Sequence, residues 1–132
     1  MKVVDASVGY KWIVPENDSD KAMALQSEDL HAPDFFPIEL ANAFNTSQVR
    51  GRIPDAQTAL GDLLLQLPSL HESISLLPRA LEISRLAGRR SIYDLLYVAL
   101  AEREQCELIT ADQKLFNSLR QQFPWVIDLS TL

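Results

Sequence analysis

Short apolar runs punctuate the chain and predict buried strands. The first covers residues 2–5, where two β-branched valines stand directly before Asp5. β-Branched side chains favour strands because they are stiff and pack well on a pleated surface. Four further runs are predicted as strands from their length and their neighbouring turn residues. They cover residues 30–33, 69–72, 107–110 and 125–128.

Helical periodicity fills the segments between these runs. The clearest case is the segment 91–105, in which apolar side chains recur at positions 92, 95, 96, 99 and 100. Pro54 is predicted to take the favoured first position of one helix, and Asp18 or Ser19 is predicted to cap another. Further helices are predicted over residues 6–14, 19–27, 35–50, 55–67, 77–86 and 113–121.

The alternation of strands and helices predicts an α/β fold. We expect a single domain over residues 1–132, with a mostly parallel sheet that helices cover on both faces. In such sheets, ligands bind beyond the carboxyl ends of the strands. The segments that directly follow predicted strands are therefore the places to look for chemistry.

Composition and charge give indications of the cellular compartment and of the binding partners of the protein. The chain has one cysteine and a net charge of −6. A single cysteine fits a reducing cytoplasm, and the first residues show neither the apolar run nor the cleavage site of a signal peptide. No apolar stretch approaches the roughly 18 residues of a membrane span. The acidic balance counts against nucleic acid, unless cations offset the acids where a phosphate must lie.

Two acids follow predicted strands. Asp5 ends the first run, and Asp112 lies just past the run 107–110. If these two strands are neighbours, both carboxylates project from the same edge of the sheet and converge. Each acid also has a simpler interpretation, because an aspartate at this place can cap the helix that follows.

Two further acids lie near the starts of predicted helices and have apolar neighbours in the sequence. Glu39 and Asp94 are each flanked on both sides by apolar residues. A carboxylate near a buried face is costly unless it is paired, hydrogen-bonded or metal-bound. The simpler interpretations are a favourable helix dipole for Glu39, and a capping box with Ser91 or an ion pair with Arg90 for Asp94.

As a set, the four carboxylates indicate a hard divalent cation. Mg²⁺ and Mn²⁺ prefer oxygen ligands, and they activate water in phosphodiester hydrolysis. His31 and His71 stand in no zinc-like spacing and are interpreted as surface or packing residues, and Cys106 has no neighbouring ligand. The chain has neither a glycine-rich phosphate loop nor a GxSxG nucleophile.

The four acids stand in four sequence blocks. In chain order these are VVDAS ending at Ser7, PIELANA from Pro37, SIYDLLYVALA from Ser91, and ITAD ending at Asp112. In this order and spacing, the blocks resemble those of PIN-domain ribonucleases, in particular the VapC-type toxins of prokaryotic toxin–antitoxin pairs. The resemblance extends over essentially the whole chain.

The resemblance implies a PIN-like three-layer α/β/α sandwich with a mostly parallel sheet of four or five strands. It also implies Mg²⁺ or Mn²⁺ as cofactor, an RNA substrate, a homodimer and a cognate antitoxin protein. The residues that it places in catalysis and at the metal are Asp5, Glu39, Asp94 and Asp112. The residues that it places along the pocket wall are Ser7, Thr110 and Asn42.

Two departures from the family pattern bear on the metal count. Leu95 stands where a small residue usually follows the third acid, and residues 113–117 contain no further acid. The expectation of a second tightly held metal is therefore weaker than that of the first.

Other functions make different demands on the sequence. An inactive PIN-like module that acts through protein contacts predicts missing or displaced acids. A haloacid-type phosphatase needs a second aspartate two residues after Asp5, where Ser7 stands. A response-regulator receiver needs an acidic pair near the end of the first strand, and this segment offers one acid.

Overall fold

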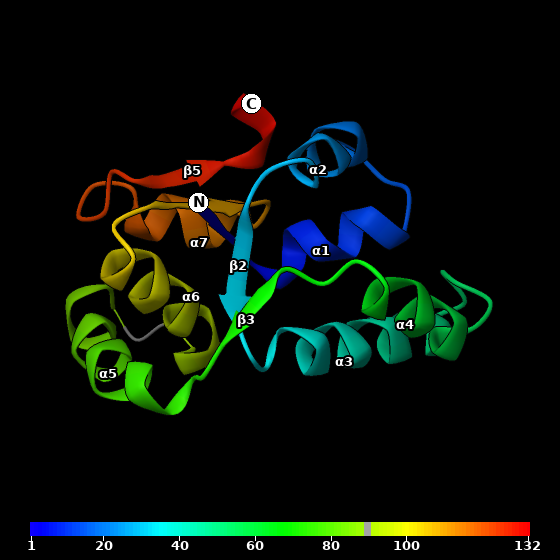
Figure 1. The fold of residues 1–132 in the computed structure, drawn as a ribbon, viewed down its shortest axis with the longest axis horizontal. Coiled ribbons are helices and arrows are strands. Elements are labelled where there is room, and N and C mark those ends of the chain that lie inside the picture. Colours follow the sequence, from blue (N-terminus) through cyan, green and yellow to red (C-terminus); the bar gives the residue numbers. More distant parts are fainter. Residues whose placement is uncertain (89–90) are drawn as a thin grey trace.

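The computed structural model describes residues 1–88 and 91–132, and a parallel sheet lies at its centre (Figure 1). Within the described residues the sheet has five strands in the order β3-β2-β1-β4-β5, and each neighbouring pair is parallel. The predicted α/β architecture is confirmed. The strands are β1 (Lys2–Val4), β2 (Leu30–Pro33), β3 (Ser69–His71), β4 (Glu107–Thr110) and β5 (Val126–Asp128).

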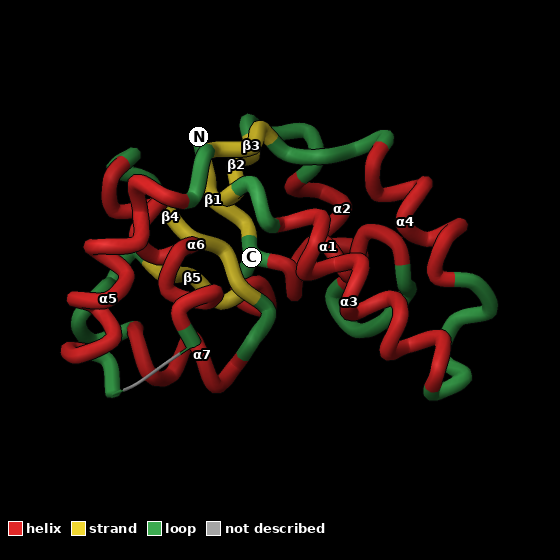
Figure 2. The backbone as a smooth tube through the Cα atoms, turned by 90° about the horizontal axis from the view of Figure 1, so that it is seen from below, coloured by secondary structure: helices red, strands yellow, loops and turns green. Residues whose placement is uncertain are grey.

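Helices form a layer on each side of the sheet, as Figures 1 and 2 show together. Four helices occupy one side: α1 (Ala6–Ile13), α2 (Ser19–Leu25), α3 (Phe36–Val49) and α4 (Ala56–Leu64). The other side holds α5 (Leu77–Leu86), α6 (Ile92–Arg103) and α7 (Gln113–Leu119). Two short 3₁₀ turns, Ile74–Leu76 and Leu129–Thr131, were not predicted. No helix in the described segments is both long and apolar enough to cross a membrane.

The neighbouring strands β1 and β4 mark the point at which the strand order reverses. β1 continues toward β2 through α1 and α2, whereas β4 continues toward β5 through α7 on the opposite face. In open parallel sheets, ligands bind beyond the carboxyl ends of strands at such a point. Val4 pairs with Ile109, so Asp5 and Thr110 emerge beside each other at this edge.

Helices α1, α6 and α7 each begin at a side chain that caps them. Asp5, Ser91 and Asp112 each accept a hydrogen bond from a backbone amide in the first turn of the helix that follows. This confirms the capping interpretation of the two strand-end aspartates. The expected Arg90–Asp94 ion pair lies outside the described residues.

One predicted helix start was wrong, and another was right in position but lacks the predicted capping bond. Pro54 does not occupy the first helical position of α4, because Asp55 takes the N-cap after it and caps with its carboxylate. Asp18 stands at the start of α2 with a φ of 65°, and within the described residues its side chain makes no capping bond. Ser19 instead accepts a hydrogen bond from the amide of Glu16, which ties down the loop before the helix.

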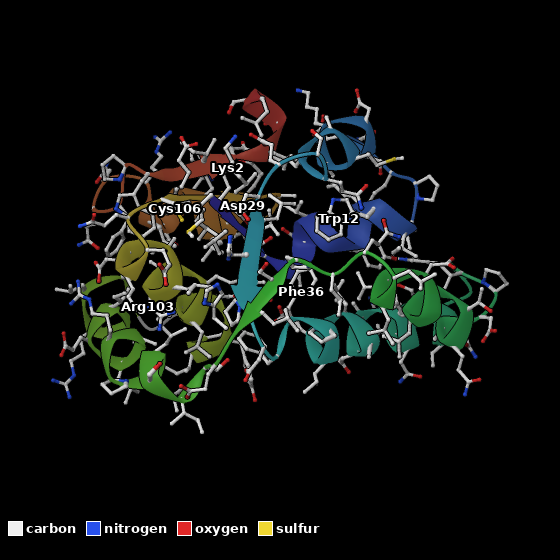
Figure 3. The ribbon with its side chains drawn as sticks, in the orientation of Figure 1. Lys2, Trp12, Asp29, Phe36, Arg103 and Cys106 are labelled. Atoms are coloured by element: carbon white, nitrogen blue, oxygen red, sulfur yellow. The ribbon has the colours of Figure 1, made fainter. Side chains whose placement is uncertain are left out.

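α1 lies unusually close to α3, and Gly9 makes this approach possible. A Cβ atom on Gly9 would lie 2.6 Å from the Phe36 ring and 2.8 Å from Leu40 Cδ1. Trp12 and Phe36, both labelled in Figure 3, have ring centroids 6.0 Å apart in the same contact. The packing of α1 on α3 therefore sets how far the start of α1 lies from the start of α3.

The two histidines tie the edge strand β3 to the body of the sheet. His31 Nδ1 lies 2.8 Å from His71 Nε2, and His31 Nε2 lies 2.8 Å from Asp29 Oδ1. Arg103 Nη2 lies 3.4 Å from His71 Nδ1, and a guanidinium only donates. The hydrogen bonds therefore run in one direction, from Arg103 through both rings to Asp29 (labelled in Figure 3). This supports a structural interpretation of both histidines.

Replacing Gly9 with alanine should destabilise the protein. The added methyl overpacks the α1–α3 contact, at a cost of about 1–3 kcal/mol, which outweighs the roughly 0.5–1 kcal/mol that alanine gains in a helix. Gly61→Ala is the matched control. A Cβ atom at Gly61 meets nothing within 4 Å, so this substitution should stabilise α4. Urea unfolding of both variants measures the changes, and equal stabilisation of the two would contradict the close approach.

Candidate active site

Asp5 follows β1 and holds the central place in the candidate site. It is only 5% exposed, and both of its carboxylate oxygens accept hydrogen bonds. Oδ1 accepts from the Ser7 hydroxyl and, at 3.3 Å, from the Val8 amide. Oδ2 accepts from the Thr110 hydroxyl. The first turn of α1 and the end of β4 therefore hold the same carboxylate.

Burial dominates the charge state of Asp5. Loss of water raises the pKa of Asp5 from 3.8 to about 7, although hydrogen bonds from Ser7, Thr110 and the Val8 amide act to lower it. The charge of Glu39 raises this pKa further. The group therefore exchanges its proton near neutral pH, where a bound cation could replace that proton.

Glu39 reaches the site from the first turn of α3. Its carboxylate accepts a hydrogen bond of 2.8 Å from the Tyr97 hydroxyl on α6. Burial raises the pKa of Glu39, the hydrogen bond from Tyr97 opposes this rise, and the charge of Asp94 adds to it. Helix-dipole stabilisation therefore explains only part of the setting of Glu39, because a buried donor on another helix also holds it.

Asp94 comes from the first turn of α6, one turn before Tyr97. Burial is the largest cause of the raised pKa of Tyr97, and the charges of Glu39, Asp5 and Asp94 raise it further. Charges affect a buried group in this way only when they lie close to it. Three of the four predicted acids, those at positions 5, 39 and 94, therefore act on one buried hydroxyl, and Glu39 accepts its hydrogen bond.

Asp112 lies at the rim of the same site. Its side chain is exposed, and its backbone amide donates a hydrogen bond of 3.0 Å to the Thr110 hydroxyl that holds Asp5. The Ser7 hydroxyl accepts a similar bond of 2.9 Å from the Ala111 amide. Both hydroxyls thus connect Asp5 to the segment that carries Asp112. The role of Asp112 as a metal ligand stays a prediction.

A pocket of about 290 Å³ opens beside Glu39, between α1 and α3. Its described wall includes Ala43, which lies one turn after Glu39, rather than the exposed Asn42. The role predicted for Asn42 stays a prediction. Residues of the wall that bear on the chemistry are Ser7, Tyr10, Lys11, Glu16 and Glu39.

The donor set suits a hard divalent cation by its chemistry. Carboxylate oxygens are the ligands that Mg²⁺ and Mn²⁺ prefer, and burial makes the charges of Asp5 and Glu39 costly unless a cation balances them. Within residues 1–88 and 91–132, no three carboxylate, histidine or cysteine side chains are already arranged around one metal position.

Tyr97 is the residue of this site that sequence reasoning missed. It stands three residues after Asp94 in an otherwise apolar run, and this spacing places both side chains on one face of α6. The phenol hydroxyl of a tyrosine on the same helix face as Asp94 was the sequence signal that indicated a site residue. Lys11 and Glu16 gave no comparable signal, because their place beside Glu39 depends on how α1 packs against α3.

Asp5→Asn tests the burial of the central carboxylate. Because folding raises the pKa of Asp5, its favourable contribution to stability is complete below about pH 4 and is lost as the pH rises through 7. Asparagine has no charge to bury. The free energy of unfolding of the variant, relative to that of the parent, should therefore rise by up to about 4 kcal/mol from acidic to alkaline pH. Urea unfolding in a chelator measures this, and a difference independent of pH would contradict the assignment.

Comparisons with known proteins identify the family. The family model of the PIN domain matches residues 2–120. The ribonuclease VapC9 of Mycobacterium tuberculosis is 32% identical over 126 residues, which cover 94% of this chain and 95% of that protein. The ribonuclease VapC3 of Pyrobaculum aerophilum is 31% identical over 131 residues, which cover 95% and 96%.

A solved structure shares the fold. The crystal structure of PAE2754 from Pyrobaculum aerophilum superposes with a TM-score of 0.73 at 24% identity and covers 98% of this chain and 91% of that chain. Sequence blocks, sheet topology and converging acids agree with this likeness. The chain therefore belongs to the PIN domain family and, within it, to the VapC-type proteins.

Proposed function

We propose that the protein is a metal-dependent endoribonuclease that hydrolyses RNA phosphodiester bonds, and that it is the toxin of a type II toxin–antitoxin pair. The observation that carries the proposal is the buried carboxyl of Asp5 where β1 and β4 end, with a pKa of about 7 and with Glu39 beside it. Support comes from the relatives, which are named as ribonucleases.

In this proposal four carboxylates hold Mg²⁺ or Mn²⁺, directly or through water. They belong to Asp5, Glu39, Asp94 and Asp112. When bound, the cation supplies an activated water and stabilises the leaving oxygen of the phosphodiester. It also provides the positive charge that an acidic chain needs where a phosphate must lie.

Hydroxyl groups keep these acids in place for catalysis. Ser7 and Thr110 hold the two oxygens of Asp5, so the carboxylate enters the site in one orientation. Tyr97 does the same for Glu39 from the opposite face of the sheet. Such preorganisation reduces the rearrangement that substrate binding would otherwise demand.

The same proposal includes protein partners. We expect a homodimer and a cognate antitoxin, both in the cytoplasm. Ile74, Leu77 and Leu81 expose apolar side chains one turn apart along the 3₁₀ turn and α5. An apolar stripe of this kind is typical of a protein-contact surface, and it supports the expectation of a partner.

Asp5→Asn and Asp94→Asn should each reduce RNA cleavage at least about a hundredfold, because each removes a charged ligand from the cation. Asp20→Asn, on the exposed start of α2, is the matched control and should cleave as the parent does. Cleavage of total bacterial RNA with added Mg²⁺ or Mn²⁺ measures the rates. Parental rates in both site variants, with folding intact, would instead support an inactive binding module.

Tyr97→Phe should alter the pH dependence of cleavage. The hydroxyl bond lowers the pKa of Glu39, so its loss raises that pKa and leaves more of the carboxyl protonated below neutral pH. We expect the acidic limb of the kcat/KM profile to move to higher pH, so that cleavage on that limb falls below the parental rate. An unshifted profile would show that Tyr97 does not control Glu39.

A further inference from the structure

Lys11 lines the same pocket as Glu39, and two hydrogen bonds hold it there. Its ammonium donates to the Asn17 carbonyl at 2.6 Å and to Glu16 Oε1 at 3.0 Å. The side chain is only 12% exposed, whereas that of Glu16 is 43% exposed. Lys11 is therefore fixed in position by the backbone of the following loop, while its ion-pair partner is free to exchange with another anion.

The pocket places Lys11 beside Glu39, one of the four acids, and beside Ser7. Ser7, which binds Asp5, and Lys11 lie four residues apart on one face of α1, and both line the pocket. This spacing corresponds to about 6 Å along the helix, close to the step between successive phosphates of an extended strand. Glu39 and Ala43 of α3 form the facing wall.

Two carboxylates line this wall, those of Glu16 and Glu39, and Lys11 is the group in it that suits a phosphate. Lys11 is the one cationic residue among the described residues that line the pocket. An ammonium has three donors, and two of them are used by Asn17 and Glu16. The third remains for an oxygen anion in the pocket, where the small side chains of Ala43 and Ala111 leave room for it.

We propose that the pocket between α1 and α3 holds the phosphate next to the scissile one in single-stranded RNA, with Lys11 as its direct contact and Glu16 as a competing anion. This inference rests on the proposed ribonuclease function and adds a substrate-binding position to it. The exposed Glu16 gives way when the strand enters, because a surface ion pair of this kind is weak. The Asn17 carbonyl keeps the ammonium in place during the exchange.

Opposite changes at the two residues test the proposal. The substrate is a labelled oligonucleotide that spans a site cut by the parent protein in total bacterial RNA. Lys11→Gln should raise KM about tenfold with a much smaller change in kcat, and should reduce the salt dependence of binding by about 0.7 in slope. Glu16→Gln should lower KM by about threefold, because it removes the competing charge.

Lys21→Gln is the matched control. Lys21 also pairs with a nearby aspartate, Asp18, and donates to a backbone carbonyl, that of Ser130, but it lies on α2 away from the pocket. Its variant should keep the parental KM and salt slope. Thermal unfolding of all three variants separates binding from folding, and if Lys11→Gln does not fold, the fall in KM of Glu16→Gln decides.

The outcomes distinguish this inference from the function on which it rests. If the parent protein cleaves no RNA with Mg²⁺ or Mn²⁺, the proposed function fails. If the parent cleaves RNA but both pocket variants keep its KM and salt slope, only the RNA-binding position is overturned. The RNA-binding position is overturned also if Lys11→Gln weakens only the binding of a protein partner. In that case the pocket binds protein and not RNA.

Discussion

The buried carboxyl of Asp5 is the interaction on which the rest of the site depends. Burial makes its charge costly, and the hydroxyls of Ser7 and Thr110 compensate only part of that cost, so its pKa lies near 7 rather than near 4. A fold that needed Asp5 only as a helix cap could leave it exposed, as it does Asp112. The environment of Asp5 instead suits a group that exchanges a proton for a cation.

Packing elsewhere in the molecule places other groups around the Asp5 carboxyl. The reversal of strand order between β1 and β4 places Asp5 beside Thr110. The close approach of α1 and α3 at Gly9 brings the first turn of α3, and with it Glu39, toward the same edge. Tyr97 then reaches Glu39 from α6, so elements from both faces of the sheet meet at the acids.

The sequence predicted the fold better than it predicted the surroundings of the four acids, whose role stays a prediction. Strong periodicity located α6, and strand-end aspartates located the carboxyl edge of the sheet, because both signals are local. The predicted start of α4 was wrong because Pro54 and Asp55 are each suited to a helix start, and the capping bond of the Asp55 carboxylate places Asp55 at the N-cap. The contacts of Tyr97 and Lys11 depend on helices distant in sequence, so no local pattern could specify them.

Cation binding at neutral pH tests the central claim most directly. If Asp5 exchanges a proton for a divalent cation, Mg²⁺ or Mn²⁺ binding must release protons, and the release must grow as the pH falls below about 7. Titration calorimetry in buffers of different ionisation enthalpy measures the number released. We expect the number of protons released to increase from pH 8 to pH 6. Binding without proton release over that range, or no binding at all, would contradict it.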